Sequence, residues 1–121
     1  MTTSEIATVL AWHDALNEQD FDTLLQVSSD DIEFGDANGA GQGQDALLEW
    51  VRSLDVKVEA GRMYVRDGVV VVEEQVTSST GTTTAAAAFR VVRDHVTSMF
   101  RHKDLASALA ATELTEKDFT G

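Results

Sequence analysis

The first half of the chain has the spacing of amphipathic helices. Apolar side chains recur every three or four residues up to a break at Asn17-Glu18-Gln19. Asp20 is then placed to cap a second, short helix. We therefore expect two antiparallel helices at the start of the chain. Their apolar faces contain Ile6, Val9, Leu10, His13 and Leu16 in the first helix, and Phe21, Leu24 and Leu25 in the second.

A short strand, a loop and a third helix are expected next. Ile32 and Phe34 alternate with polar neighbours, as strand residues do. The glycine-rich segment 35–43 predicts a mobile loop. Asp45 then opens a helix with a broad apolar stripe, which is formed by Leu47, Leu48, Trp50, Val51 and Leu54.

The second half of the chain changes to a period of two and predicts four strands. Asp67-Gly68 is its strongest hairpin signal, and residues 78–81 have the composition of a turn. Asp104 is placed to cap a small helix after the last strand. We expect the first of these strands to begin at Val56 and the others to run over 69–77, 82–93 and 96–103.

The alanines at 85–88 oppose this pattern, because alanine favours helix on intrinsic propensity. Three threonines precede them and Phe89, Val91 and Val92 follow, and the segment between the turns is short for a capped helix. We therefore interpret the segment as strand. Its small side chains leave space that either the helices or a ligand would fill.

Composition limits the classes of partner. The 121 residues suit one domain, and 43% hydrophobic content is enough for a core on one face of a sheet. A net charge of -12 disfavours nucleic acid and membrane surfaces as partners. The chain has no cysteine for disulfides or thiolate chemistry, and its start lacks the pattern of a signal peptide. We expect a cytoplasmic protein.

The order of elements resembles that of the nuclear-transport-factor-2-like superfamily, whose members are also called SnoaL-like or cystatin-like α+β proteins. The resemblance covers nearly the whole chain and implies one domain over 1–121. It implies a curved sheet, mixed or antiparallel, that wraps around the N-terminal helices and encloses a conical pocket, and it implies a homodimer. Local support comes from Ala15-Leu16-Asn17 with Asp20, from Asp30-Asp31, and from Val96-Thr97 through Asp104-Leu105. The superfamily holds isomerases, hydrolases, cyclases and non-catalytic binders, so function must come from the site.

Two enzyme families within this resemblance suggest site residues. The segment from Asp30 to Asp36 is similar to that around the general base of ketosteroid isomerase, which places Asp36 on the catalytic aspartate. Trp12 and Ala87 stand where that enzyme has its two oxyanion donors, so the chemistry of those donors is missing or only partly replaced. The resemblance to limonene epoxide hydrolase places Glu74, Val76 and Arg101 on the arginine and two aspartates of that family, and Asp36 on an asparagine.

These matches define a candidate pocket with one polar end. Strand alternation puts Glu74 on the same face as Val72. In this register Asp36, Glu74 and Arg101 are the candidate catalytic residues. The candidate ligand-binding residues around them are Trp12, Phe34, Val72, Ala87, Phe89 and Met99.

Each candidate also has a structural interpretation. Asp36 is either a general base in an apolar pocket or a carboxylate that caps a loop or pairs with Arg101. Glu74 either serves as acid or base or lies on the solvent face of its strand. A tryptophan on an amphipathic helix is more often a core residue than a ligand contact, and this applies to Trp12.

The histidines give no metal site. His13 and His102 are either proton shuttles or hydrogen-bonded structural residues, and we favour the structural role for both. Neither histidine forms a helical pair with another, and the spacing of His102 and Asp104 is not that of a metal site. We assign no metal and expect no cofactor.

Three hypotheses for function remain. The first is a cofactor-independent isomerase, hydrolase or cyclase that acts on a small, largely apolar molecule, with Asp36 as acid or base. The second is a domain that binds such a molecule without turnover. The third is a dimeric interaction scaffold that pairs through the open face of its sheet. The β-branched run over 69–72, which suggests burial on both faces, also motivates the dimer.

Overall fold

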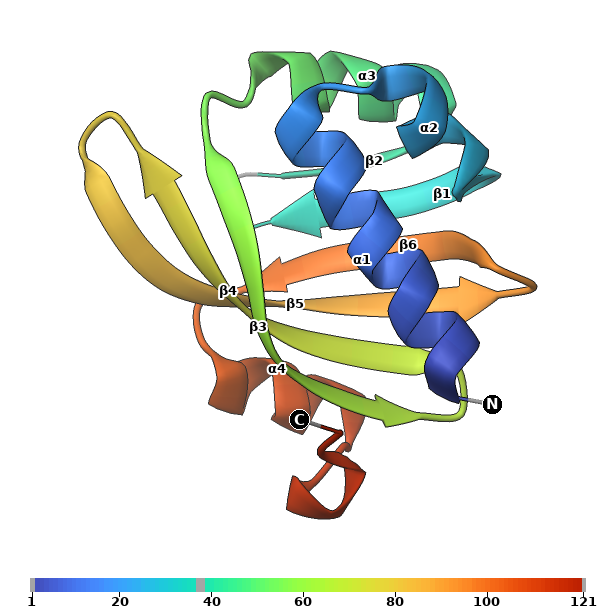
Figure 1. The fold of residues 1–121 in the computed structure, drawn as a ribbon, viewed down its shortest axis with the longest axis vertical. Helices are drawn as coiled ribbons and strands as arrows, with labels where there is room; N and C mark the ends of the chain where they lie inside the picture. The colour runs from blue at the N-terminus through green and yellow to red at the C-terminus, as the bar shows by residue number, and fades with distance from the viewer. Residues whose placement is uncertain (1, 37–38, 121) are drawn as a thin grey trace.

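The computed structural model describes residues 2–36 and 39–120, in which helices cover a strongly bent sheet (Figure 1). Within these ranges, no helix is both long and apolar enough to cross a membrane. In chain order the elements are α1 (Thr2–Glu18), α2 (Phe21–Gln26), β1 (Ser28–Asp36), β2 (Gly39–Gln42), α3 (Gln44–Ser53), β3 (Lys57–Arg66), β4 (Val69–Ser78), β5 (Gly81–Val92), β6 (His95–His102), α4 (Leu105–Thr112) and the 3-10 helix η1 (Glu116–Asp118).

The strands form one six-stranded sheet in the order β2-β1-β6-β5-β4-β3. β1 and β6 run parallel, and the other neighbours are antiparallel. α1 crosses the concave face of the sheet, with α2 and α3 beside one end of it (Figure 1). The expected α+β class, with a curved mixed sheet around the N-terminal helix, is confirmed.

The concave face and α1 enclose the main core. Val9, Trp12 and Leu16 of α1 pack there against inward-facing strand residues. Leu10, which the periodicity placed on the apolar face, is instead 41% exposed. It follows Val9 by one residue, about 100° around the helix, and so lies outside the arc that faces the sheet. The inward-facing strand residues include Ile32, Phe34, Val70, Val72, Ala87, Phe89 and Met99.

The C-terminal part of the chain covers the other face of β3, β4 and β5. Val71 and Ala86 pack there with Ala108 of α4 and with Leu114. Burial on both faces, expected for the run over 69–72, is found from residue 70 to residue 72. The cover on the second face is the protein's own α4, so this run carries no information about a second subunit.

The loop expected over 35–43 is wrong for the residues that the structure describes. β1 continues to Asp36, and β2 returns antiparallel to it with Gly41 opposite Phe34. A Cβ atom on Gly41 would lie 2.6 Å from Cζ of Phe34. Glycine at this position therefore permits a backbone to pass close to an aromatic ring within a sheet. Residues 37 and 38, also part of the expected loop, lie outside the described ranges.

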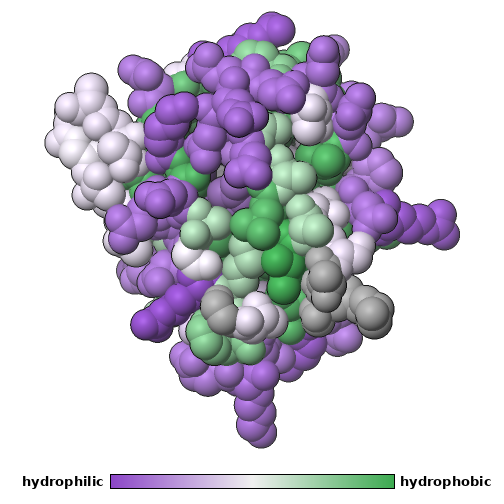
Figure 2. Space-filling view, in the orientation of Figure 1, coloured by the Kyte–Doolittle hydropathy of each residue, from purple (hydrophilic) through white to green (hydrophobic). Residues whose placement is uncertain are grey.

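The strands of the second half agree with the sequence pattern to within a residue or two, and the alanines at 85–88 are strand residues of β5. Asp67 and Gly68 both have positive φ, 53° and 81°, as a tight hairpin turn requires. The β4–β5 hairpin projects beyond the rest of the sheet (Figure 1). Its exposed tip, rich in serine and threonine, forms the pale cluster at the left of Figure 2, where hydrophilic residues surround a central band of hydrophobic ones.

Candidate functional site

A buried histidine–carboxylate pair joins α1 to the concave face of β4. Glu74 points inward like Val72 and is only 1% exposed. Its Oε2 lies 2.5 Å from Nε2 of His13. The Nδ1 atom of His13 lies 2.8 Å from the carbonyl oxygen of Val9, one helical turn earlier. Both polar ends of the imidazole are therefore held inside the core.

Arg101 approaches the same carboxylate from β6. Its Nε lies 3.5 Å from Oε1 of Glu74. Among the described residues, neither of these two buried atoms has a hydrogen-bond partner. A buried polar atom without a partner costs roughly 1–3 kcal/mol and is uncommon in native structures. The ion pair of Glu74 Oε1 and Arg101 Nε is therefore the strongest candidate for a functional site.

A bulge in the neighbouring strand lies beside Glu74. The β3–β4 pairing is regular up to Ala60 opposite Glu74 and resumes at Met63 opposite Val72, so β3 has one extra residue between them. Gly61 lies in this bulge, where a Cβ atom would be 3.0 Å from the carbonyl oxygen of Glu73. Bulges bend a strand and redirect nearby side chains, and they are frequent next to functional sites.

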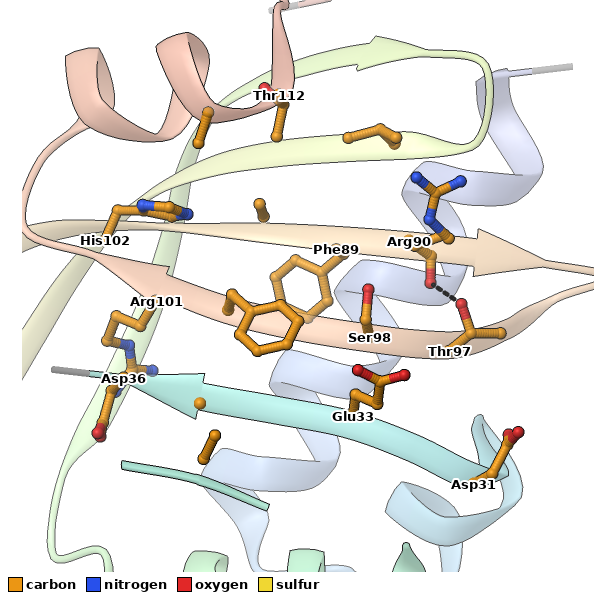
Figure 3. Close-up of a pocket in the computed structure, with 16 residues that line it drawn as sticks. Asp31, Glu33, Asp36, Phe89, Arg90, Thr97, Ser98, Arg101, His102 and Thr112 are labelled. Atoms are coloured by element: carbon orange, nitrogen blue, oxygen red, sulfur yellow. Dashed lines mark hydrogen bonds between the residues drawn. The ribbon is translucent and has the colours of Figure 1, made fainter. Parts of the chain in front are cut away.

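Asp36 ends β1 next to Arg101. Gly35 pairs with Phe100 on the parallel strand β6, so Asp36 and Arg101 follow as neighbours at the same end of the two strands (Figure 3). Asp36 is partly exposed, whereas Glu74 is buried. Across the strand order, Arg101 lies between the two carboxylates. The structure thus brings the three candidate catalytic residues to one end of the sheet, and their roles in a reaction stay predictions.

Trp12 does not offer its indole N–H to the candidate site. Its Nε1 donates to the hydroxyl of Ser28 at 3.1 Å, and that hydroxyl donates to the carbonyl of Leu24 at 2.7 Å. The ring packs edge-on against Phe89, with centroids 5.4 Å apart. Trp12 therefore supports the junction of α1, α2 and β1 and contributes an apolar wall.

The other candidate ligand-binding residues belong to the core. Phe34 stacks on Trp50 at 5.2 Å between ring centroids. Each is at most 4% exposed, so a ligand that touched them would have to displace existing packing. Their role in binding stays a prediction. The set is Phe34, Val72, Ala87, Phe89 and Met99.

Two hollows lie near this region. One, of about 360 Å³, opens between the C-terminal ends of α1 and α3 and the β3 and β4 strands, and the core residues Leu16 and Val51 line it. The larger one, of about 850 Å³, lies on the convex face of the sheet (Figure 3). Two candidate catalytic residues, Asp36 and Arg101, are among the residues that line the larger hollow. Its lining also includes Asp31 and Glu33 of β1, Arg90 of β5, and Ser98 and Phe100 of β6.

His102 and the capping Asp104 are not part of the buried pair. His102 lines the convex hollow, as does its neighbour Arg101. Asp104 caps α4 as expected, and hydrogen bonds from Ser107 hold the pKa of its carboxyl below the usual 3.8. In residues 2–36 and 39–120, no three histidine, aspartate or glutamate side chains are grouped so as to hold a metal ion.

His13 is the site residue that sequence reasoning undervalued. Its position with Val9, Trp12 and Leu16 at helical spacing indicated that it faces the core. A buried imidazole needs a partner, and Glu74 was the one charged residue already placed on the facing strand as an inward candidate. Combining these two signals would have suggested the pair, but nothing in the spacing shows which part of β4 lies below His13.

The sequence profile of the SnoaL-like domain matches residues 9–106 of the chain. The chain belongs to the SnoaL-like family. No curated protein matches it closely enough to be counted as a relative. The family includes proteins with different chemistries. Membership therefore explains the fold, and the activity has to be inferred from the residues of the site.

Solved structures support this assignment at the level of the fold. An NTF2-like protein of unknown function from Cytophaga hutchinsonii superposes with a TM-score of 0.76 at 16% identity, over 85% of this chain and 92% of that one. A putative ketosteroid isomerase from Kribbella flavida gives 0.75 at 14%, over 82% and 76%. An LEH-like epoxide hydrolase from M. tuberculosis gives 0.69 at 20%, over 92% and 96%.

Proposed function

We propose that this SnoaL-like protein is an enzyme that transfers protons on a small, largely apolar molecule, using its own side chains and no cofactor. The observation that carries this proposal is the buried Glu74 carboxylate, whose Oε1 has no hydrogen bond among the described residues and faces Arg101. A carboxylate within an apolar core is a strong candidate for a general base. A guanidinium beside it can stabilise negative charge that develops on a substrate.

The two atoms suggest how a substrate would be held. An oxygen atom of the substrate that lies beside both atoms would accept a hydrogen bond from Arg101 Nε, while Glu74 Oε1 takes a proton from the substrate or from a water molecule. The O–H or C–H bond breaks, its proton ends on Oε1, and its electron pair stays on the substrate, where Arg101 offsets the new charge. Enolate formation, attack by water and ring closure all begin with such a step.

The substrate would be largely apolar because the surroundings of the pair are apolar. The hollow of about 850 Å³ gives a substrate a way toward the pair, since Arg101 and Asp36 are among the residues that line it. Core side chains must part to admit a ligand. Asp36, partly exposed near Arg101, is placed to act as a second acid or base during the reaction.

Turnover of candidate substrates tests this proposal. Apolar ketones, lactones and epoxides are screened with the wild-type protein and with the Glu74→Gln and Asp36→Asn variants. Loss of a general base lowers kcat by about 100-fold or more, so Glu74→Gln should do so. Glu73→Gln, on the other face of β4, is the matched control and should keep full activity. A Glu74→Gln variant that retains full kcat would remove Glu74 from the mechanism.

The alternative is binding without chemistry, and the same screen separates it. In that case a compound from the screen binds to the wild-type protein, as seen by calorimetry, and is recovered unchanged. Asp36→Asn tests the second carboxylate independently. If Asp36 acts as an acid or base, the variant keeps its affinity for the compound and loses kcat.

We also propose that two copies of the chain pair over the end of the convex hollow that lies away from Asp36 (Figure 3). Acidic Asp31 and Glu33 lie along β1 on one side of it, and Arg90 of β5 lies on the other (Figure 3). Phe100 of β6 is 37% exposed among them. A two-fold axis through this surface would bring the acidic edge of each copy onto the arginine of the other and cover both phenylalanines.

Sedimentation velocity tests the dimer. The wild-type protein should sediment at twice its chain mass of 13.1 kDa. Phe100→Glu should shift it to the single-chain mass, because the substitution puts a charge at the centre of the interface. Leu10→Glu, at an exposed apolar residue of α1, is the matched control and should leave the dimer intact. A wild-type protein that sediments only at 13.1 kDa would exclude this assembly.

A further inference from the structure

The hydrogen bonds of His13 determine where its protons must be. Its Nδ1 lies 2.8 Å from the Val9 carbonyl oxygen, which can only accept, so Nδ1 must carry a proton. Its Nε2 lies 2.5 Å from Oε2 of Glu74. Two groups at that distance need a proton between them, because two lone pairs would repel each other. A neutral imidazole with its proton on Nδ1 has none to give from Nε2.

One additional proton must therefore belong to the pair. It is either on Nε2, which makes an imidazolium beside a carboxylate, or on Oε2, which makes a neutral imidazole beside a carboxylic acid. The surroundings exclude water from both groups, since His13 is 2% and Glu74 1% exposed. Arg101 lies 3.5 Å from the other carboxylate oxygen, and Asp36 follows Gly35 on the strand next to that of Arg101.

We propose that His13 and Glu74 share one proton and act as a single acid–base unit, in which Oε1 of Glu74 faces the substrate and His13 is the positioning residue behind it. This inference rests on the proposed function for its role in a reaction. Its structural basis is independent, because it follows from the two contacts of the imidazole.

The His13–Glu74 unit already holds one shared proton, and it can still take up a proton from the substrate. When Oε1 accepts a proton from the substrate, the shared proton rests on Nε2 of His13. The carboxylic acid then keeps its hydrogen bond, with Oε2 as the acceptor from the imidazolium. No proton has to leave the core during the step, and the negative charge that the substrate gains balances the positive charge that the pair gains.

Nuclear magnetic resonance on the full chain labelled with ¹⁵N-histidine tests the shared proton. The chain has three histidines, so the spectrum is simple to assign with His95→Gln and His102→Gln, two substitutions outside the pair. We expect Nδ1 of His13 to be protonated and a proton far downfield to correlate with its ring. This downfield signal should disappear in Glu74→Gln and persist in the matched control Glu73→Gln.

A wild-type His13 with a bare Nδ1 and its only ring proton on Nε2 would overturn the inference, and so would a downfield signal that survives in Glu74→Gln. If Glu74→Gln does not fold, the ring nitrogens of wild-type His13, assigned by elimination, still decide the question. A protein that shows the shared proton but turns over no compound in the screen would reject the proposed function alone. Turnover with a bare Nδ1 would reject the shared proton alone.

Discussion

Charged side chains are buried and paired on the concave face of the sheet and exposed on its convex face. Alternate residues of the same strands form the two faces. On the concave face, Glu74 and His13 are buried beneath α1 and hold each other. On the convex face, Glu33 and Arg90 line an open hollow and are exposed in the single chain. A charge in water needs no protein partner, whereas a buried one without a partner costs several kcal/mol.

This difference indicates that the helix above the sheet, rather than the strand pattern, decides what a charged residue does. Glu73 and Glu74 are chemically identical neighbours on β4, and only Glu74 lies under α1. Apolar residues of similar volume would often make such a core at least as stable as an ionisable pair does. The presence of the pair therefore points to a function for it. The following predictions test the contrast between the two faces.

Breaking the buried pair should have the largest effect on stability. Glu74→Ala leaves His13 and Arg101 without their carboxylate inside the core, so the free energy of unfolding should fall by about 3–5 kcal/mol. Glu73→Ala, one residue away, should change it by no more than about 1 kcal/mol. Urea unfolding followed by circular dichroism gives both values. Equal losses in the two variants would show that the faces do not differ in this respect.

Truncating apolar residues on the two faces should give a similar but smaller contrast. Met99 is fully buried on the concave face, and its neighbour Phe100 is 37% exposed on the convex face. Met99→Ala should lower the free energy of unfolding by about 2–5 kcal/mol, because it creates a cavity in the core. Phe100→Ala should cost about 1 kcal/mol or less, when both are measured at a protein concentration at which the chain is monomeric. A larger loss of unfolding free energy in Phe100→Ala than in Met99→Ala would contradict the placement of the core on the concave face.

A methyl group at Gly41 should disturb the edge of the concave core. Its Cβ would lie 2.6 Å from Cζ of Phe34, so the ring must move and lose part of its packing. We expect Gly41→Ala to lower the free energy of unfolding by about 1–3 kcal/mol. Combining it with Phe34→Leu should cost less than the sum of the two single changes, because the shorter side chain removes the clash. Strict additivity would mean that this contact is not the cause.

The cap of α4 on the convex side should have the smallest effect, and one that depends on pH. The pKa of Asp104 is lowered by hydrogen bonds from Ser107, so its ionised form stabilises the fold above the unfolded-state value near 3.8. This contribution is lost as the pH falls through the lowered folded-state pKa. Asp104→Ala should therefore lower the melting temperature at neutral pH, and its difference from wild type should shrink in acid. The exposed Asp55→Ala is the control, and a difference that grows in acid would contradict the prediction.

Much of the fold could be predicted from the sequence because local rules determine it. The periodicity of α1, the Asp20 and Asp104 caps and the Asp67-Gly68 turn each depend on residues a few positions apart. The alanines at 85–88 were assigned to a strand from their β-branched neighbours, and the structure confirms this. β2 was missed because its glycines match a loop, and the reason for Gly41 is a distant aromatic ring.

The candidate site could be predicted only in part. Strand alternation and resemblance together placed Glu74 and Arg101 on one face, and their contact in the structure agrees with that register. The sequence did not link His13 to Glu74, because local periodicity gives no information about contacts between residues 61 positions apart. It also could not show that the Trp12 N–H is already bonded to Ser28.

The sequence by itself determined the class of fold, the caps and turns, the faces of most strands and the acidic, cysteine-free surface, because these follow from interactions between near neighbours and from composition. Only the tertiary structure decided that Glu74 meets His13 and Arg101, that α4 covers one face of β4, and that the main open hollow is convex. Those outcomes depend on how a helix crosses a bent sheet. Such contacts join residues far apart in the sequence, so the local spacing of apolar residues does not reveal them.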